Sequence, residues 1–167
     1  TVTGTGAGAL TLNAPAGTLT FANGANVSIG GLLTTNTNAT SINDADLTSV
    51  GMTINGAVTY AGTASVIRTL SAKGGLLTVG SAITGGNRTL YLTGDDVNVN
   101  AAVSSATMNI RPFNNIKTMG LAGAAGDLQL SVAELNNLST TTRLHLGTNN
   151  TLGQMTGQID INAHNWG

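Results

Sequence analysis

The pattern that most constrains this chain is a short alternation of apolar and polar residues, clearest in residues 88–103, RTLYLTGDDVNVNAAV. This stretch contains two predicted strands, Thr89–Thr93 and Val97–Asn100, joined by a turn at Gly94-Asp95-Asp96. Alternation over about four to eight residues is typical of a half-buried β-strand. Weaker copies of the same phrase recur along the chain as ALTLNAPAGTLTF, NVSIGGLL, GMTINGAVTY, GLLTVGSAI, SATMNI, DLQLS, TRLHLG and GQIDINA.

Predicted strands in equivalent positions recur about every 20 to 25 residues, a period typical of solenoids, in which each repeat stacks on the next. The segments between them are rich in Gly, Asn, Asp and Ala, and Gly and Asn tolerate the left-handed conformation of tight corners. The predicted strands are Leu10–Leu12, Leu19–Phe21, Val27–Ile29, Ser41–Ile42, Met52–Ile54, Val58–Tyr60, Val66–Leu70, Leu76–Val79, Leu90–Thr93, Val97–Asn100, Met108–Ile110, Leu128–Ser131, Leu144–Leu146 and Ile159–Ile161. We therefore expect an all-β fold, a right-handed parallel β-helix (β-solenoid) of about seven coils.

The composition favours a narrow core. Aromatic residues make up 3% of the 167 residues, and Leu, Val, Ile and Ala supply most of the apolar side chains. A wide β-sandwich core is normally filled by large side chains, whereas stacked columns of branched aliphatic residues suit a thin solenoid. Asn-Gly dipeptides between strands also favour hairpins, so an antiparallel meander or sandwich is the alternative fold.

Three segments depart from the alternation. Thr34–Asn38 is polar and is predicted to be a loop at one corner. Pro112–Ala125 is predicted to be a loop, or a short helix around Ile116–Leu121. Ser131–Leu138 contains Ala, Glu and Leu, which favour a helical turn. We interpret residues 1–167 as one solenoid segment of a longer repeat-containing chain, because both ends lie within the pattern.

Residues 88–103 and 127–147 resemble the repeats of large bacterial exoproteins of the filamentous-haemagglutinin type, which are exported by two-partner secretion. TLYLTGDDVNVNAAV is similar to the repeat TLxLxAGxDVxVNAAI, and DLQLSVAELNNLSTTTRLHLG is similar to LxLSxAELxxI followed by TLxIG. MTINGAVTY is a looser copy, and GQIDI resembles a coil of the form GNITV. The resemblance implies an internal segment of an extracellular β-helical shaft, and it carries over no catalytic residue.

Paired carboxylates occur at Asp95-Asp96 and at Asp44-x-Asp46. Both pairs lie at predicted corners, and calcium needs about six oxygen ligands, so we interpret them as turn residues, with a weak cation site as the alternative. A polysaccharide-cleaving site requires an acidic cluster together with Arg or Lys, and Arg88 alone lies near an acid pair. The other basic residues are Arg68, Lys73, Arg111, Lys117 and Arg143. We therefore expect no enzyme activity.

Histidine and aromatic residues are the remaining candidates for a site. His145 and His164 are far apart and cysteine is absent, so neither a zinc site nor a cofactor is expected. His145 lies between two leucines and is predicted to face solvent. Tyr60, Tyr91 and Trp166 are predicted to cover coil edges, with contact to a sugar or protein partner as the alternative. Thr-x-Thr pairs raise the alternative of an ice-binding face, but the predicted outward positions vary between coils.

Stacking of coils predicts columns of like residues. Inward columns are expected to include Leu12, Ile29, Ile54, Val79, Leu92, Val99, Ile110, Leu130, Leu146 and Ile161. Amide ladders between coils are predicted for Asn13, Asn55, Asn98, Asn100 and Asn109. Asn-x-Ser/Thr sequons permit glycosylation at Asn26, Asn38, Asn87, Asn137 and Asn149.

Charge and cysteine content bear on location and partners. A net charge of −1 with scattered charged residues offers no basic surface for nucleic acid, and the apolar runs are too short to cross a membrane. The absence of cysteine is compatible with export in an unfolded state, and the resemblance implies a secreted or bacterial cell-surface protein. The expected partners are further copies or neighbouring shaft segments joined end to end, and cell-surface glycans or proteins.

The expected function is that of a structural, non-catalytic shaft segment of a secreted bacterial adhesin or extracellular fibre. A self-stacking filament or surface-layer subunit is one alternative, and a carbohydrate-binding or carbohydrate-cleaving β-helix is another. Solenoid ends recruit other chains unless they are blocked. The predicted self-association edge comprises Gly157, Ile159, Ile161 and Trp166, which are expected to pair with the first coil at Leu10 and Leu12.

Overall fold

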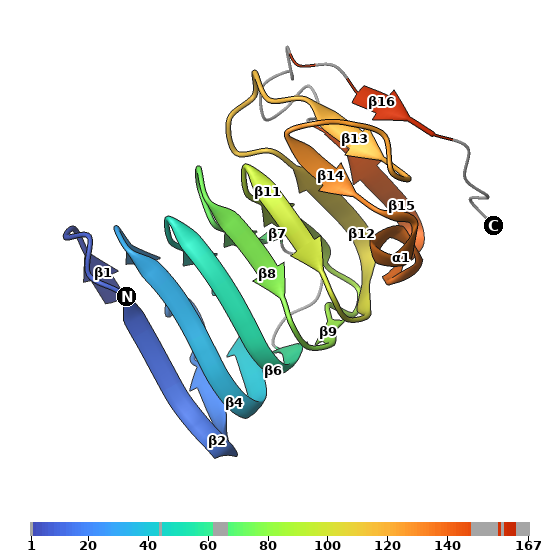
Figure 1. Ribbon diagram of the computed structural model, residues 1–167. Helices are drawn as coiled ribbons and strands as arrows, with labels where there is room; N and C mark the ends of the chain where they lie inside the picture. Colours follow the sequence, from blue (N-terminus) through green and yellow to red (C-terminus); the bar gives the residue numbers. More distant parts are fainter. Residues whose placement is uncertain (1, 44, 62–66, 148–156, 158, 163–167) are drawn as a thin grey trace.

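The chain winds into a right-handed parallel β-helix whose coils stack along one axis, with the N-terminal coils at the left of Figure 1 and the C-terminal elements at the upper right. The computed structural model describes residues 2–43, 45–61, 67–147, 157 and 159–162. Its strand pairs are parallel. This pairing confirms the predicted solenoid and contradicts the antiparallel meander.

Each coil contributes to three walls, because the long strands bend in the middle and serve two walls in succession. Wall A contains the first halves of β2 (Leu10–Phe21), β4 (Leu32–Asn43) and β6 (Gly51–Ala61), followed by β8 (Leu76–Val79) and β11 (Asp96–Val99). Wall B contains the second halves of β2, β4 and β6, then β9 (Ile83–Thr84) and the first halves of β12 (Val103–Arg111) and β15 (Leu138–Leu146). Wall C contains β1 (Val2–Gly4), β3 (Val27–Ile29), β5 (Leu47–Thr48), β7 (Ile67–Ser71), β10 (Thr89–Thr93) and the second halves of β12 and β15.

The register repeats at the spacing that the sequence predicts. Leu33 pairs with Met52, 19 residues later, and Met52 pairs with Leu77, 25 residues later. The solenoid has about five coils, slightly fewer than the predicted number of about seven. After Arg111 the chain builds β13 (Met119–Leu121) and β14 (Leu128–Leu130) outside the main sheet and returns to it at β15.

Stacked aliphatic side chains fill the narrow interior. Of the predicted inward residues, Ile29, Ile54, Val79, Leu92, Val99, Ile110 and Leu130 are buried. Leu12 and Leu146 lie at the ends of their walls and are half-buried. Ile161 is 59% exposed, so its predicted inward position is wrong, because it lies on an edge strand.

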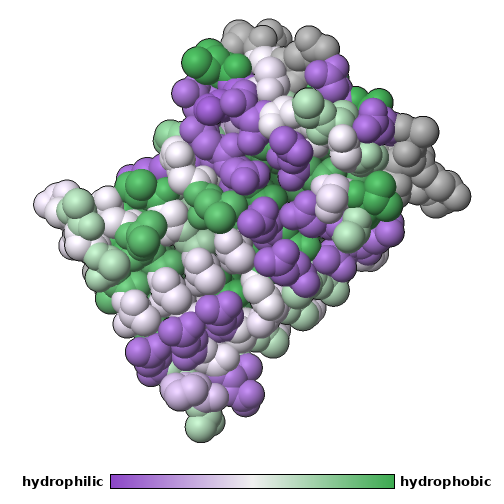
Figure 2. All heavy atoms as spheres, in the orientation of Figure 1, coloured by the Kyte–Doolittle hydropathy of each residue, from purple (hydrophilic) through white to green (hydrophobic). Residues whose placement is uncertain are grey.

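The outward side of wall A also carries regular columns. Thr11, Thr34, Thr53 and Thr78 are in register across four coils, which is a more regular column than the sequence predicted. In Figure 2, which shows this face, hydrophobic side chains gather over the upper ends of the wall A strands and hydrophilic ones over the lower ends of the first coils. Wall A therefore presents parallel apolar and polar bands to its surroundings.

Two local predictions are wrong for a common reason. Thr34–Asn38 is part of β4 rather than a loop, and its neighbouring threonines Thr35 and Thr37 are buried. Met119–Leu121 forms the strand β13, which was expected to be loop or helix. In both cases pairing with a neighbouring strand overrides a weak local pattern. The predicted helical turn is confirmed as α1 (Val132–Asn136).

The C-terminal end consists of a separate three-stranded parallel sheet in the order β14 (Leu128–Leu130), β13, β16 (Ile159–Ile161). β14 packs against β11, so this sheet continues wall A beyond the regular coils (Figure 1). β13 and β14 are joined by only the residues 122–127. A Cβ on Gly120 in β13 would collide with the backbone of this connection, and a Cβ on Gly126 in the connection would collide with the backbone of β13.

Thr35 provides a test of the inward column on wall A. It is fully buried, between Leu12 and Ile54, and its hydroxyl has no hydrogen-bond partner among the described residues. Thr35→Val removes this unpaired hydroxyl and keeps the shape, so we expect the free energy of unfolding to rise by about 1 kcal/mol in urea titrations. Thr34→Val, on the outward side of the same strand, should change it by less than about 0.5 kcal/mol. Loss of stability in Thr35→Val would contradict the inward placement.

Candidate functional site

An asparagine ladder connects the first three coils at the corner between walls A and B. The Asn36 amide nitrogen donates to Asn13 Oδ1 at 2.9 Å, and the Asn55 amide nitrogen donates to Asn36 Oδ1 at 3.0 Å. The predicted ladder is therefore confirmed for Asn13 and Asn55, and the sequence analysis missed Asn36 between them. The column continues at Gly80, which has no side chain to extend it.

The other predicted ladder members have different environments. Asn98 and Asn100 are half-buried and exposed, respectively. Asn109 lies on wall C in register with Tyr91 and His145, and it is buried with no hydrogen-bond partner for its amide among the described residues. No amide ladder of these three residues forms within the described part of the chain.

The ladder predicts a graded loss of stability. Asn36→Ala removes two side-chain hydrogen bonds and Asn13→Ala removes one, each contributing about 0.5 kcal/mol at an exposed site. We expect the loss in free energy of unfolding to be about twice as large for Asn36→Ala as for Asn13→Ala, measured by urea denaturation. Equal losses would contradict a column in which Asn36 bonds both neighbours.

At the C-terminal end, side chains of α1 and of its C-cap residue make hydrogen bonds that the backbone of a further coil would otherwise make. Val99 is the last residue of β11; its N–H donates to Glu134 Oε1 at 3.0 Å and its carbonyl accepts from the Asn137 amide at 2.8 Å. The other oxygen of Glu134 accepts from the Ser131 backbone N–H and hydroxyl, which completes a capping box. This part of the edge of wall A is therefore satisfied and closed to strand addition.

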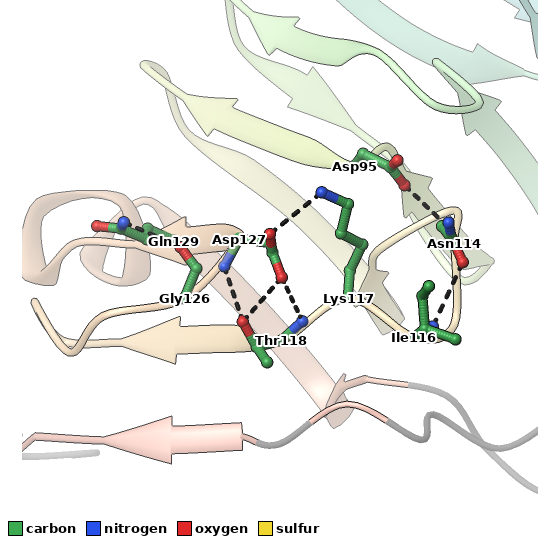
Figure 3. Close-up of polar contacts among 8 residues, drawn as sticks. All are labelled: Asp95, Asn114, Ile116, Lys117, Thr118, Gly126, Asp127 and Gln129. Carbon is green, nitrogen blue, oxygen red and sulfur yellow. Dashed lines mark hydrogen bonds and ion pairs between the residues drawn. The ribbon is translucent and has the colours of Figure 1, made fainter.

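Asp127 fixes the short connection between β13 and β14 (Figure 3). Its carboxylate accepts from the backbone N–H and hydroxyl of Thr118, both at 2.9 Å, and from the Lys117 ammonium at 3.1 Å. The backbone hydrogen bond from Thr118, followed by that from Lys117, lowers the pKa of Asp127 from 3.8 to about 2. These hydrogen bonds hold the loop in place, and they use the Asp127 carboxylate in contacts within its own chain.

Acid should open this loop before it unfolds the coils. Because the folded-state pKa of Asp127 lies below the ordinary value, its stabilising effect is present above pH 3.8 and is lost as the pH falls to about 2. We expect amide hydrogen exchange at Thr118, normalised for intrinsic exchange, to accelerate across this interval while exchange at Leu92 does not. In Asp127→Asn the exchange at Thr118 should be fast at neutral pH and should lose this pH dependence. An unchanged profile in that variant would contradict the assignment.

The paired carboxylates serve the backbone, as expected for turn residues. Asp95 Oδ1 accepts from the Asn114 N–H at 2.8 Å (Figure 3), and Asp96 accepts from the Val97 N–H at 2.9 Å. Asp46 accepts from the Thr69 N–H at 2.7 Å, and Asp44 lies outside the described residues. The described residues contain no group of three or more carboxylate, histidine or cysteine side chains that is suited to a metal ion.

Two arginines, Arg88 and Arg111, contact backbone carbonyl groups and an aromatic ring. Arg88 is 5% exposed, and its guanidinium donates to the carbonyl oxygens of Tyr60 and Gly85 at 3.0 and 3.3 Å. Arg111 lies over the Tyr91 ring, with its Cζ 5.9 Å from the ring centroid, and burial lowers its pKa. The Arg88 side chain therefore stabilises the junction of walls B and C, and the Arg111 side chain stabilises the surface of wall C.

The described aromatic and histidine candidates, Tyr60, Tyr91 and His145, are buried or half-buried. Tyr60 and Tyr91 are 4% and 6% exposed, so the sugar-contact alternative does not apply to them. Tyr60 continues the inward column of Phe21 and Ile42 on wall B, and burial raises its pKa. His145 is half-buried, so its predicted solvent-facing position is only partly realised. His164 and Trp166 lie outside the described residues.

The N-terminal end of the solenoid is open. Among the described strands, β1 pairs with β3 and β2 pairs with β4, so the opposite edges of β1 and β2 are free. Behind these edges lies an apolar hollow of about 470 Å³, lined by Leu10, Leu12, Leu19 and Phe21. None of residues 1–43 is charged, whereas natural edge strands are commonly blocked by charged side chains.

The predicted self-association residues that the structure describes lie at both ends, and Trp166 lies outside the described residues. Leu10 and Leu12 border the open hollow, as a coil-edge role requires. Ile159 and Ile161 lie on β16, the outer strand of the C-terminal sheet, and are 39% and 59% exposed. Gly157 packs against the Lys117 carbonyl so closely that a Cβ would collide with it, which indicates a structural role.

Searches of protein-family models, curated proteins and solved structures found no match to this chain. Within the part of the chain that the structure describes, no helix has the length and apolar character needed to cross a membrane.

Proposed function

We propose that this chain is a structural, non-catalytic shaft segment of a secreted bacterial adhesin or extracellular fibre, of the filamentous-haemagglutinin type. The observation that carries the proposal is the open N-terminal end, where a long free strand edge surrounds an apolar hollow. A further coil of the same cross-section placed there extends the parallel hydrogen bonding and covers Leu10, Leu12 and Leu19.

The mechanical role follows from how the coils are joined. Parallel backbone hydrogen bonds run along the axis in all three walls, and the asparagine ladder adds side-chain hydrogen bonds in the same direction. Tension along the axis is therefore shared among many bonds at each interface between coils. Such a rod holds a binding region away from the cell surface without any chemistry of its own.

A self-stacking filament subunit is the second candidate, because the open end also fits another copy. Its C-terminal counterpart is the edge of β16, where Ile159 and Ile161 are exposed. A filament requires both ends to join repeatedly, whereas a shaft segment requires only that the open end is covered.

Association through the open end can be tested by sedimentation. We expect the isolated chain to form concentration-dependent assemblies, and we expect Leu12→Lys to give monomers because it places a charge in the apolar hollow beside the free edge. Thr84→Lys, at an exposed position on wall B, is the matched control and should assemble as the unmodified chain does. A monomer at high concentration for the unmodified chain would contradict the proposal that this end recruits a coil.

A second variant separates the two candidates. Ile161→Lys charges the exposed β16 edge without altering the N-terminal end. If it also prevents assembly, the copies join head to tail as a filament does; if it has no effect, the open ends alone associate.

Immunogold labelling of the producing cells tests the location: label on extracellular fibres is expected, and label confined to the cytoplasm would contradict the adhesin proposal.

A further inference from the structure

The sequence contains two Asn-Gly dipeptides, Asn23-Gly24 and Asn55-Gly56, and the fold places them in different surroundings. In an Asn-Gly dipeptide the asparagine side chain loses its amide readily, because glycine has no Cβ to hinder attack by its backbone nitrogen. The two dipeptides have the same chemistry in an unfolded chain. A difference between them in the folded protein therefore comes from the structure around each.

Asn23 and Gly24 are the central residues of an exposed turn between β2 and β3. The turn is closed by a hydrogen bond from the Ala25 N–H to the Ala22 carbonyl at 2.9 Å. Gly24 has a φ of 68°, and a Cβ built on it would meet nothing within 4 Å, so the turn borders open space. Among the described residues, neither the Gly24 N–H nor the Asn23 amide has a hydrogen-bond partner.

At the second dipeptide both groups that would react are held by hydrogen bonds. The Gly56 N–H donates to Ser81 Oγ at 2.9 Å, and the Asn55 amide nitrogen donates to Asn36 Oδ1 at 3.0 Å. Gly56 also packs so closely against Thr37 that a Cβ would collide with the Thr37 carbonyl oxygen. The Gly56 nitrogen can therefore attack the Asn55 side chain only if this corner opens.

We propose that Asn23 is a site of spontaneous deamidation in the folded protein and that the fold protects Asn55. The Gly24 backbone nitrogen loses its proton to solvent and attacks Asn23 Cγ. The new N–Cγ bond closes a succinimide ring, and the departing amide nitrogen takes up a proton and leaves as ammonia. Water then adds to either ring carbonyl and breaks its bond to nitrogen, which gives aspartate or isoaspartate. The reaction consumes water, releases ammonia and needs no other reactant.

The modification places a carboxylate at the open N-terminal end. None of residues 1–43 is charged, and the neighbouring Ala22 and Ala25 line the apolar hollow behind the free strand edges. A charged side chain at such an edge disfavours the addition of another strand. An ageing chain therefore loses its ability to recruit a coil. This consequence rests on the proposed function, whereas the chemical step at Asn23 does not.

The experiment follows both dipeptides in one sample of the unmodified protein, incubated at neutral pH and at low concentration. An endoproteinase that cleaves before aspartate separates them by cutting before Asp44 and Asp46, and mass spectrometry detects the change from amide to acid; a new cut before position 23 marks the aspartate product. We expect Asn23 to react at least about fivefold faster than Asn55, at which one or more hydrogen bonds must first break. In urea the two rates should converge.

Two variants test the cause of the difference. Ser81→Ala removes the acceptor of the Gly56 N–H, so it should speed the reaction at Asn55 by up to about fivefold and leave Asn23 unchanged. Asn23→Gln should stay unmodified, because its longer side chain requires a less favourable six-membered ring. The proposal is overturned if Asn55 reacts as fast as Asn23 in the folded protein, or if Asn23 stays intact there while it reacts in urea. An unchanged rate at Asn55 in Ser81→Ala would contradict the protection by Ser81.

The effect on assembly is measured by sedimentation of Asn23→Asp, with Asn23→Gln as the matched neutral control. We expect Asn23→Asp to assemble at higher concentrations than the control does. Equal assembly of the two variants would contradict the effect of the charge on the open end. If the unmodified chain does not assemble at all, the proposed coil recruitment fails, and the mass-spectrometric rates still decide whether Asn23 is the modification site.

Discussion

The structure depends on one interaction above all, the parallel backbone hydrogen bonding between successive coils. Each coil is too thin to bury its own apolar side chains, and it becomes stable only when the coils on either side cover it and satisfy its N–H and C=O groups. Columns such as Leu33, Met52, Leu77 and Val97 arise from this stacking, because register places equivalent residues directly above one another. At the two ends of the rod a neighbouring coil is missing, so apolar side chains and backbone N–H and C=O groups there must be satisfied in another way.

The two ends meet that requirement differently. At the C-terminal end, Glu134 and Asn137 supply the hydrogen bonds that Val99 would otherwise receive from another strand, and Asp127 holds the loop that follows β13. At the N-terminal end, β1 and β2 keep free edges over a hollow core. The two described ends therefore differ in how the strand edges of wall A are satisfied.

The sequence predicted the repeating unit well and the departures from it poorly. Period-two alternation located Val27–Ile29, Leu76–Val79 and Ile159–Ile161 with the observed bounds, because those strands carry apolar residues on one face. The polar TTNTN stretch gave no such signal, since in it buried positions are occupied by Thr35 and Thr37 and only pairing with β2 and β6 reveals the strand. The protection of Asn55-Gly56 was equally hidden: it depends on Ser81, which is 25 residues from Gly56 in the sequence and reaches its N–H only when the coils stack.

The coil at the open end has one neighbour fewer than the interior coils, so stability is graded along the rod rather than uniform. In a stack where each repeat touches only its neighbours, unfolding proceeds from the end with the weaker boundary. The first coil is bonded on one side alone, whereas the last regular coils are held by α1, its capping box and the C-terminal sheet. We therefore expect unfolding to begin at β1 and β2 and to proceed inward. A coil that docks on this end would turn the least stable coil into an interior one.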